Sequence, residues 1–171
     1  MKIKQLSHAE TRNEEKIFPL IVIGENIHSP QNVGMIFRIC EIMGVRHLYL
    51  TGSSPVPPGR KIAKSARSAE KRVPFSYNED TMEVLNILKQ EKYMTIGLEI
   101  TDQSKDIRTF DFQSIDKIAL IIGAENYGLS ASTLNALDVT IQIPMFGTLS
   151  SLNVASALSI GLYEIIKQWS N

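Results

Sequence analysis

Unbroken apolar runs alternate along this chain with apolar residues at helical spacing. The run at residues 18–23 predicts a buried strand that ends at Gly24, because parallel strands covered on both faces carry continuous apolar side chains. Similar runs predict further strands at residues 47–50, 94–98, 118–122 and 139–143.

The segment after the first strand predicts a helix over residues 30–43. Ser29 suits the N-cap, Pro30 the first helical position, and Gly44 the residue just past the end. Arg38 lies off the apolar stripe and is free to face a ligand. That stripe, the expected core face, consists of Val33, Ile36, Phe37, Cys40 and Met43.

Two more helices are expected, over residues 79–90 and 152–169, where apolar residues recur every three or four positions. Between them and the strands, the proline-rich stretch 53–59 predicts a surface loop. The alternation of strands and helices predicts an α/β fold with a mainly parallel sheet and helices on both faces. A length of 171 residues with 43% hydrophobic residues favours one domain over residues 1–171, with a polar segment at 1–16.

Charge is balanced overall but not locally. The 18 basic and 18 acidic residues cancel, which taken alone disfavours a nucleic-acid partner. Residues 60–72, however, carry six cations against the single acid Glu70, so they form either a solvated face or a positive patch. Cys40 is the only cysteine, and no apolar run is long enough to cross a bilayer, so a soluble protein of a reducing cytoplasm is expected.

Three polar or glycine-containing stretches follow predicted strands, at residues 24–38, 123–129 and 143–154. Open α/β sheets place ligand crevices at these strand ends, so the three stretches are expected to form one active site. The glycine-rich motifs that cradle dinucleotides or nucleoside triphosphates are missing. The histidines are scattered, with no cysteine or acid at ligand spacing, so no metal is expected.

These stretches resemble, in the same order and over about residues 18–168, the three motifs of the SpoU/TrmH group of SPOUT-class RNA ribose 2′-O-methyltransferases. Asn126 stands where that family often has glycine, and asparagine is the next most tolerant residue for a left-handed backbone. The matching residues are Asn26, Pro30, Asn32, Gly34, Arg38 and Gly44 in the first motif, Gly123, Glu125, Gly128 and Leu129 in the second, and Ile143, Pro144, Met145, Ser151, Leu152 and Asn153 in the third.

The resemblance implies a C-terminal deep trefoil knot within about residues 118–168, a homodimer, S-adenosylmethionine as cofactor and RNA as methyl acceptor. By the same resemblance the cofactor would lie near Leu98, Gly123, Ile143 and Leu152. The catalytic set would be Arg38, Asn32, Glu125, Ser151 and Asn153.

Simpler structural roles stay open for several of these residues. Asn32 and Glu125 are of types that often brace loops, and Ser151 and Asn153 of types that cap helices. In members of the family, the residue equivalent to Arg38 is held to activate the 2′-hydroxyl, in some cases as a base. Since arginine stays protonated in proteins, a grip on the phosphate and on developing alkoxide charge is the preferred role, with deprotonation as the alternative.

With RNA as the implied substrate, the basic segment becomes the expected phosphate-contacting surface, through Arg60, Lys61, Lys64 and Arg67. The favoured substrate is tRNA, at guanosine 18 or at the anticodon wobble ribose. Ribosomal RNA is the alternative target, and a non-catalytic RNA-binding dimer of the same fold is the alternative function.

Overall fold

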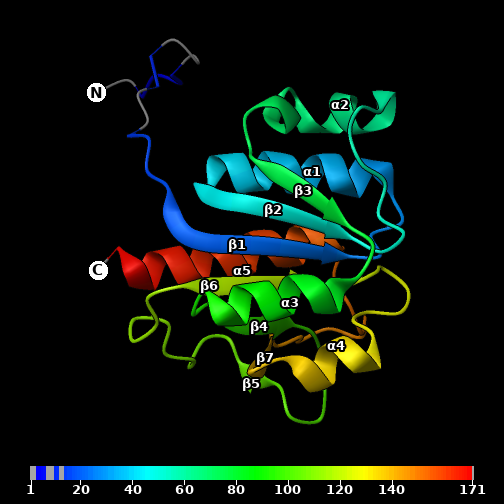
Figure 1. The fold of residues 1–171 in the computed structure, drawn as a ribbon. Helices are drawn as coiled ribbons and strands as arrows, with labels where there is room; N and C mark the ends of the chain where they lie inside the picture. The colour runs from blue at the N-terminus through cyan, green and yellow to red at the C-terminus, as the bar shows by residue number, and fades with distance from the viewer. Residues whose placement is uncertain (1–2, 7–9, 12–13, 171) are drawn as a thin grey trace.

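The computed structural model describes residues 3–6, 10–11 and 14–170, and its centre is a single seven-stranded sheet (Figure 1). The strand order is β3-β2-β1-β6-β4-β7-β5, and every ladder between these strands is parallel. This confirms the expected α/β class. The strands are β1 (Phe18–Glu25), β2 (Val45–Thr51), β3 (Phe75–Asn78), β4 (Met94–Leu98), β5 (Lys105–Asp106), β6 (Ile118–Ile122) and β7 (Val139–Gln142).

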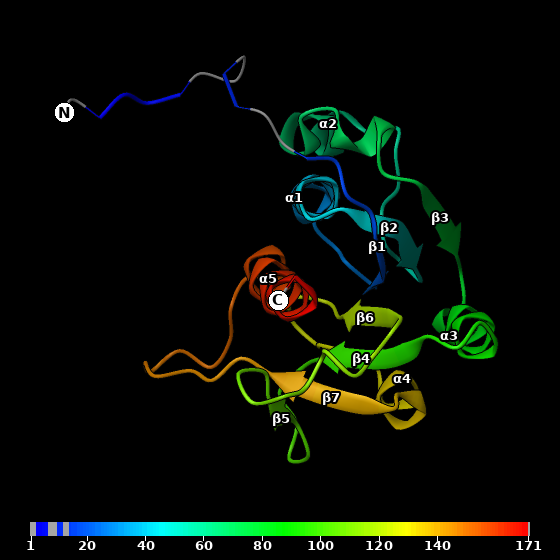
Figure 2. The same cartoon turned by 90° about the vertical axis from the view of Figure 1, so that its left-hand side faces the viewer.

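Helices cover both faces of the sheet (Figure 2). On one face, α1 packs beneath α2 and beside α5 around a large apolar cluster. On the other face, α3 and α4 cover a smaller cluster. The helices are α1 (Pro30–Ile42), α2 (Arg60–Ala66), the 3-10 turn η1 (Ala69–Lys71), α3 (Thr81–Gln90), α4 (Ala131–Ala136) and α5 (Val154–Trp169).

Local signals set the ends of α1 as expected. The Ser29 hydroxyl accepts a hydrogen bond from the Asn32 backbone N–H, and Pro30 occupies the first turn. Gly44 takes a positive φ of 63° just past the end of the helix. A Cβ atom at this position would overlap the backbone oxygen of Lys16, so glycine fits where a side chain would not. The expected core face of α1 is buried or half-buried throughout.

Five elements were not expected from the pattern: α2 and η1 in the basic segment, β3, β5 and α4. They span only two to seven residues each, too few for a periodicity to repeat. Two expected helices begin two residues later than predicted, because Asp80 and Asn153 serve as N-caps and accept bonds from the following backbone N–H groups.

The sheet reverses its direction of growth at β1. From there β2 and β3 extend to one side, while β6, β4, β7 and β5 extend to the other. The carboxyl ends of β1 and β6 therefore flank the switch point at which parallel sheets form ligand crevices. Within the described residues, no helix is long and apolar enough to cross a membrane. The trefoil knot stays a prediction.

Candidate functional site

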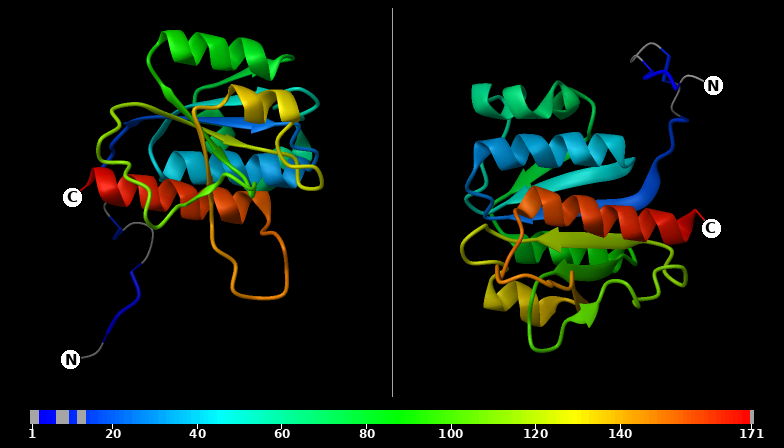
Figure 3. Two further views of the ribbon diagram at one scale, coloured as in Figure 1. Left: turned by 90° about the horizontal axis from the view of Figure 1, so that it is seen from below. Right: turned by 180° about the vertical axis from the view of Figure 1, so that it is seen from behind.

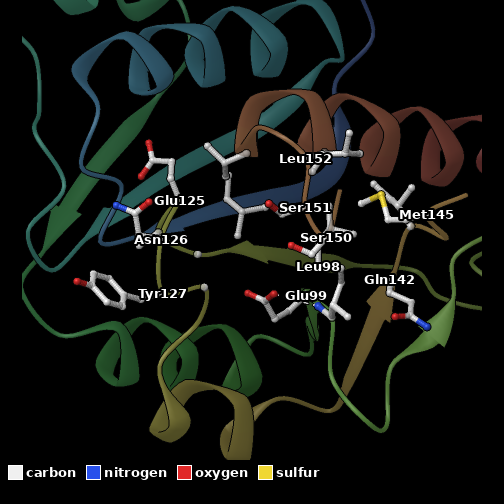
Figure 4. Close-up of a pocket in the computed structure, with 18 residues that line it drawn as sticks. Leu98, Glu99, Glu125, Asn126, Tyr127, Gln142, Met145, Ser150, Ser151 and Leu152 are labelled. Carbon is white, nitrogen blue, oxygen red and sulfur yellow. Dashed lines mark hydrogen bonds between the residues drawn. The ribbon is translucent and has the colours of Figure 1, made fainter. Parts of the chain in front are cut away.

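A cavity of about 360 Å³ opens at the carboxyl ends of β4, β6 and β7 (Figure 4). Its walls come from three loops: the residues after β4, the loop 123–128 after β6, and the segment 143–152 between β7 and α5. That last segment loops out from the body of the protein (Figure 3). Two of the three motif stretches thus line one cavity.

All four residues expected near a cofactor line this cavity: Leu98, Gly123, Ile143 and Leu152. They supply backbone and apolar surface rather than charge. Leu98 and Gly123 are buried, while Leu152 is exposed at the rim. Ser151, from the expected catalytic set, also lines the wall.

The loop after β6 turns back tightly on itself. Ala124 and Gly128 form an antiparallel bridge, with backbone bonds in both directions. A side chain on Gly123 would overlap the backbone of Gly128 and Leu129, so only glycine fits there. The positive φ of this loop is at Gly128, 65°, and not at Asn126, although asparagine would have tolerated it.

Three residues of the expected catalytic set form one hydrogen-bonded chain beside the cavity. The Asn32 side-chain amide at the start of α1 donates to Glu125 Oε1 at 2.6 Å. The Asn153 amide donates to the Asn32 Oδ1 at 3.2 Å. Asn32 is 9% exposed, so both ends of its amide are satisfied inside the protein. The chain joins all three motifs.

Glu125 is held as a carboxylate. Burial opposes its ionisation, but bonds from the Asn32 amide and from the backbone N–H groups of His28 and Ser29 outweigh it and lower its pKa. The bracing role left open for Asn32 and Glu125 is therefore observed. The same contacts fix the Glu125 carboxylate at the cavity wall, so bracing and ligand placement are compatible.

The capping role left open for Ser151 and Asn153 belongs to Asn153. Its Oδ1 accepts bonds from the backbone N–H groups of Ala155 and Ser156 at the start of α5. Ser151 lies two residues earlier, on an exposed part of the cavity wall.

Arg38 is not brought to the cavity of its own chain. It lies exposed in the second half of α1, six residues and so about 9 Å along the helix from Asn32. No carboxylate among the described residues pairs with it, and Glu41 pairs with Arg72 instead. The Arg38 guanidinium is thus available to a partner molecule.

Glu99 was not among the expected site residues, although it follows β4 and points toward the cavity in Figure 4. Its Oε2 accepts the Leu129 backbone N–H at 3.0 Å, so it ties the end of β4 to the loop after β6. The signal was a lone acid directly after an apolar strand, the same kind of signal that marked the other loops.

The four expected RNA-contacting cations, Arg60, Lys61, Lys64 and Arg67, are exposed along and just after α2. This helix forms the outermost layer of its face of the sheet (Figure 1). It sits close to α1 because Gly34 leaves room for Ile62 and Ser65. No group of three potential metal-ligating side chains occurs among the residues that the structure describes.

Comparisons with known proteins agree on one family. The model of the SpoU rRNA Methylase family matches residues 19–163. A mouse tRNA (guanosine(18)-2′-O)-methyltransferase, TARBP1, is 32% identical over 157 residues, which are 90% of this chain but only 10% of that protein. The Thermus thermophilus tRNA (guanosine(18)-2′-O)-methyltransferase is 28% identical over 97% of this chain and 86% of its own length.

A solved structure shares the fold. The SpoU methyltransferase AviRb from Streptomyces viridochromogenes, in complex with the cofactor AdoMet, superposes with a TM-score of 0.80 at 26% identity. The match covers 98% of this chain and 63% of AviRb.

Proposed function

Because the chain belongs to the SpoU rRNA Methylase family, we propose that it transfers a methyl group from S-adenosylmethionine to a ribose 2′-hydroxyl of tRNA. The observation that carries the proposal is the meeting of three sequence-distant motifs: Asn32, Glu125 and Asn153 are bonded together beside one cavity, and Glu125 lines its wall. All seven strands of the described part of the chain belong to one sheet, which supports one methyltransferase domain.

The cavity suits the cofactor. Leu98, Ile143 and Leu152 offer apolar surface to a flat nucleoside, and the tight loop at Gly123 brings backbone close to it. Glu99 and Glu125 place carboxylates at the wall, which favour a cationic ligand. When bound, S-adenosylmethionine supplies an electrophilic methyl group on a positively charged sulfur. AviRb, a relative of the same fold, is known in complex with this cofactor.

The chain's own residues position the acceptor. Transfer to a hydroxyl needs in-line alignment and removal of a weakly acidic proton, so positioning is expected to dominate the rate. The cationic guanidinium of Arg38 grips the phosphate next to the target ribose and stabilises negative charge that develops on the 2′-oxygen. Ser151 and the Asn32–Glu125–Asn153 chain hold the cavity wall against which the ribose docks.

We further propose that the active form is a homodimer in which Arg38 serves the partner's cavity. Arg38 is exposed and lies away from its own cavity. Large apolar side chains are exposed on the neighbouring helices α1 and α5, with Ile42 at 64% and Tyr163 at 62%, and on the protruding segment, with Phe146 at 87% and Leu149 at 80%. Such surface is typical of interfaces.

Two relatives named as tRNA guanosine-18 methyltransferases support tRNA as substrate, with guanosine 18 as the favoured nucleotide. We propose the cytoplasm as the place of action. The family name itself refers to ribosomal RNA, which is the second candidate. The exposed cations of α2 contact the RNA backbone in either case.

The test is transfer of tritiated methyl from S-adenosylmethionine to bulk tRNA and, separately, to ribosomal RNA, followed by nucleoside analysis. We expect labelled 2′-O-methylguanosine from tRNA, no label with Arg38→Ala, and full labelling with the matched control Arg46→Ala at the far end of β2. Label in ribosomal RNA alone would change the assigned substrate from tRNA to ribosomal RNA. RNA and cofactor binding without label in either pool would indicate a non-catalytic RNA-binding dimer.

A further inference from the structure

A second cavity, of about 500 Å³, lies away from the first, between the proline-rich loop and the basic segment. The loop contributes Pro57, Pro58 and Gly59, which give it a mainly apolar floor. Its remaining walls come from α2 and η1, through Arg60, Ala63, Glu70 and Lys71. None of these residues belongs to the proposed cofactor site.

Glu70 is the unusual member of this cavity. Its Oε2 is buried and has no hydrogen-bond partner, the only such side-chain atom in the part of the chain that the structure describes. Across the same residues no cation pairs with it, although Arg60 and Lys71 line the same cavity. A buried acceptor without a donor costs free energy, and native proteins retain few of them.

The backbone holds Glu70 in this position. Arg67 and Ser68 both have positive φ, 54° and 73°, although neither is glycine. These two residues reverse the chain after α2, so that η1 lines the same cavity as the first turn of that helix. Side chains from both ends of the basic segment thereby meet at one cavity.

We propose that this cavity binds an unpaired guanine of the substrate RNA, at a position other than the methylated nucleoside. An ionised carboxylate only accepts hydrogen bonds, and guanine alone among the four bases offers two adjacent donors, N1–H and the N2 amino group, on one edge. The proline side chains give the flat base an apolar surface. Arg60 and Lys71 supply the positive charge that its phosphate needs.

This inference rests on the proposed function for its substrate, but it is tested by binding alone. The probes are the mononucleotides GMP, IMP, AMP and UMP, added to the ¹⁵N-labelled full chain without S-adenosylmethionine. IMP differs from GMP only in lacking the N2 amino group. We expect GMP to shift the backbone amide signals of Gly59, Ala63 and Lys71, IMP to bind about tenfold more weakly, and AMP and UMP more weakly still.

Glu70→Gln replaces one acceptor oxygen by a donor and should abolish the preference for GMP over IMP. Glu79→Gln is the matched control, since it makes the same change at an exposed site next to α3, on the other face of the sheet. In methyl transfer, Glu70→Gln should raise KM for tRNA several-fold and leave kcat unchanged.

Three results would each overturn the guanine assignment. They are equal shifts with all four nucleotides, no shift of these amides at about 10 mM GMP, which is roughly ten times a weak Kd of about 1 mM, and an undiminished GMP preference in Glu70→Gln. A GMP-selective response without any methyl transfer to RNA would instead retain this site and refute the proposed function. The two proposals can therefore fail separately.

Discussion

The contact between Asn32 and Glu125 is the sharpest test of the site, because it joins two motifs that are 93 residues apart in sequence. We consider the single variants Asn32→Ala and Glu125→Ala and the double variant. A hydrogen bond to a charged group contributes roughly 1.5–3 kcal/mol, and the partial exposure of Glu125 reduces this. The expected coupling free energy is about 1–2 kcal/mol.

The assay is urea unfolding of the four proteins at one fixed concentration, because the stability of a dimer depends on concentration. A matched cycle between Asn32 and Asn153 should give a smaller coupling, since that bond is neutral and longer, at 3.2 Å. A coupling near zero for Asn32 and Glu125, or a larger one for Asn153, would refute the reasoning.

The same contact predicts a pH dependence. The pKa of Glu125 is lowered in the folded state, so its contribution to stability is present above its ordinary value of 4.5 and is lost as pH falls through the folded value. Carbon-13 NMR of the Glu125 carboxyl should therefore give a midpoint below 4.5. In Asn32→Ala that midpoint should move upward, and an unmoved midpoint would contradict the assigned cause.

Three further predictions concern ligands. Arg38→Ala should lower methyl transfer at least about 100-fold while calorimetry finds S-adenosylmethionine affinity unchanged; a large loss of cofactor affinity would show that its role is misassigned. The binding constant for tRNA should fall with salt concentration, and replacing Arg60, Lys64 and Arg67 together by alanine should make the slope of log K against log salt concentration shallower by about 2. Arg46→Ala should leave that slope unchanged. Gly123→Ala should abolish cofactor binding because its methyl group overlaps the Gly128 backbone, whereas Gly147→Ala, with open space around it, should not.

Local chemistry made much of the fold predictable. The apolar runs located β1, β2, β4, β6 and β7, and Ser29, Pro30 and Gly44 set the ends of α1. The order of strands was not predictable, because periodicity says which residues face inward and not which strands are neighbours. Elements as short as β5 and α4 carry no repeat at all.

The site was predictable by type and place, but its bonds were not. Polar residues after strands indicated one crevice, and six of the residues expected to act there line the cavity: Leu98, Gly123, Glu125, Ile143, Ser151 and Leu152. That Asn32 bridges Glu125 and Asn153 depends on side-chain geometry that spacing does not encode. Glu70 looked like one acid in a basic run, and only the burial of its unpartnered Oε2 distinguishes it.

The position of Arg38 allows a decisive test of where the complete site lies. If each site takes Arg38 from one chain and the cavity from the other, a dimer of Arg38→Ala with Gly123→Ala has one site with both defects and one with neither. Random assembly makes half of the dimers mixed, so co-expressed variants should recover about 25% of wild-type activity, although each alone is inactive. If Arg38 instead served its own cavity, every site in the mixture would carry one defect. Absence of recovery in mixed dimers isolated by two affinity tags would therefore exclude a shared site, and recovery would explain why Arg38 lies exposed on α1.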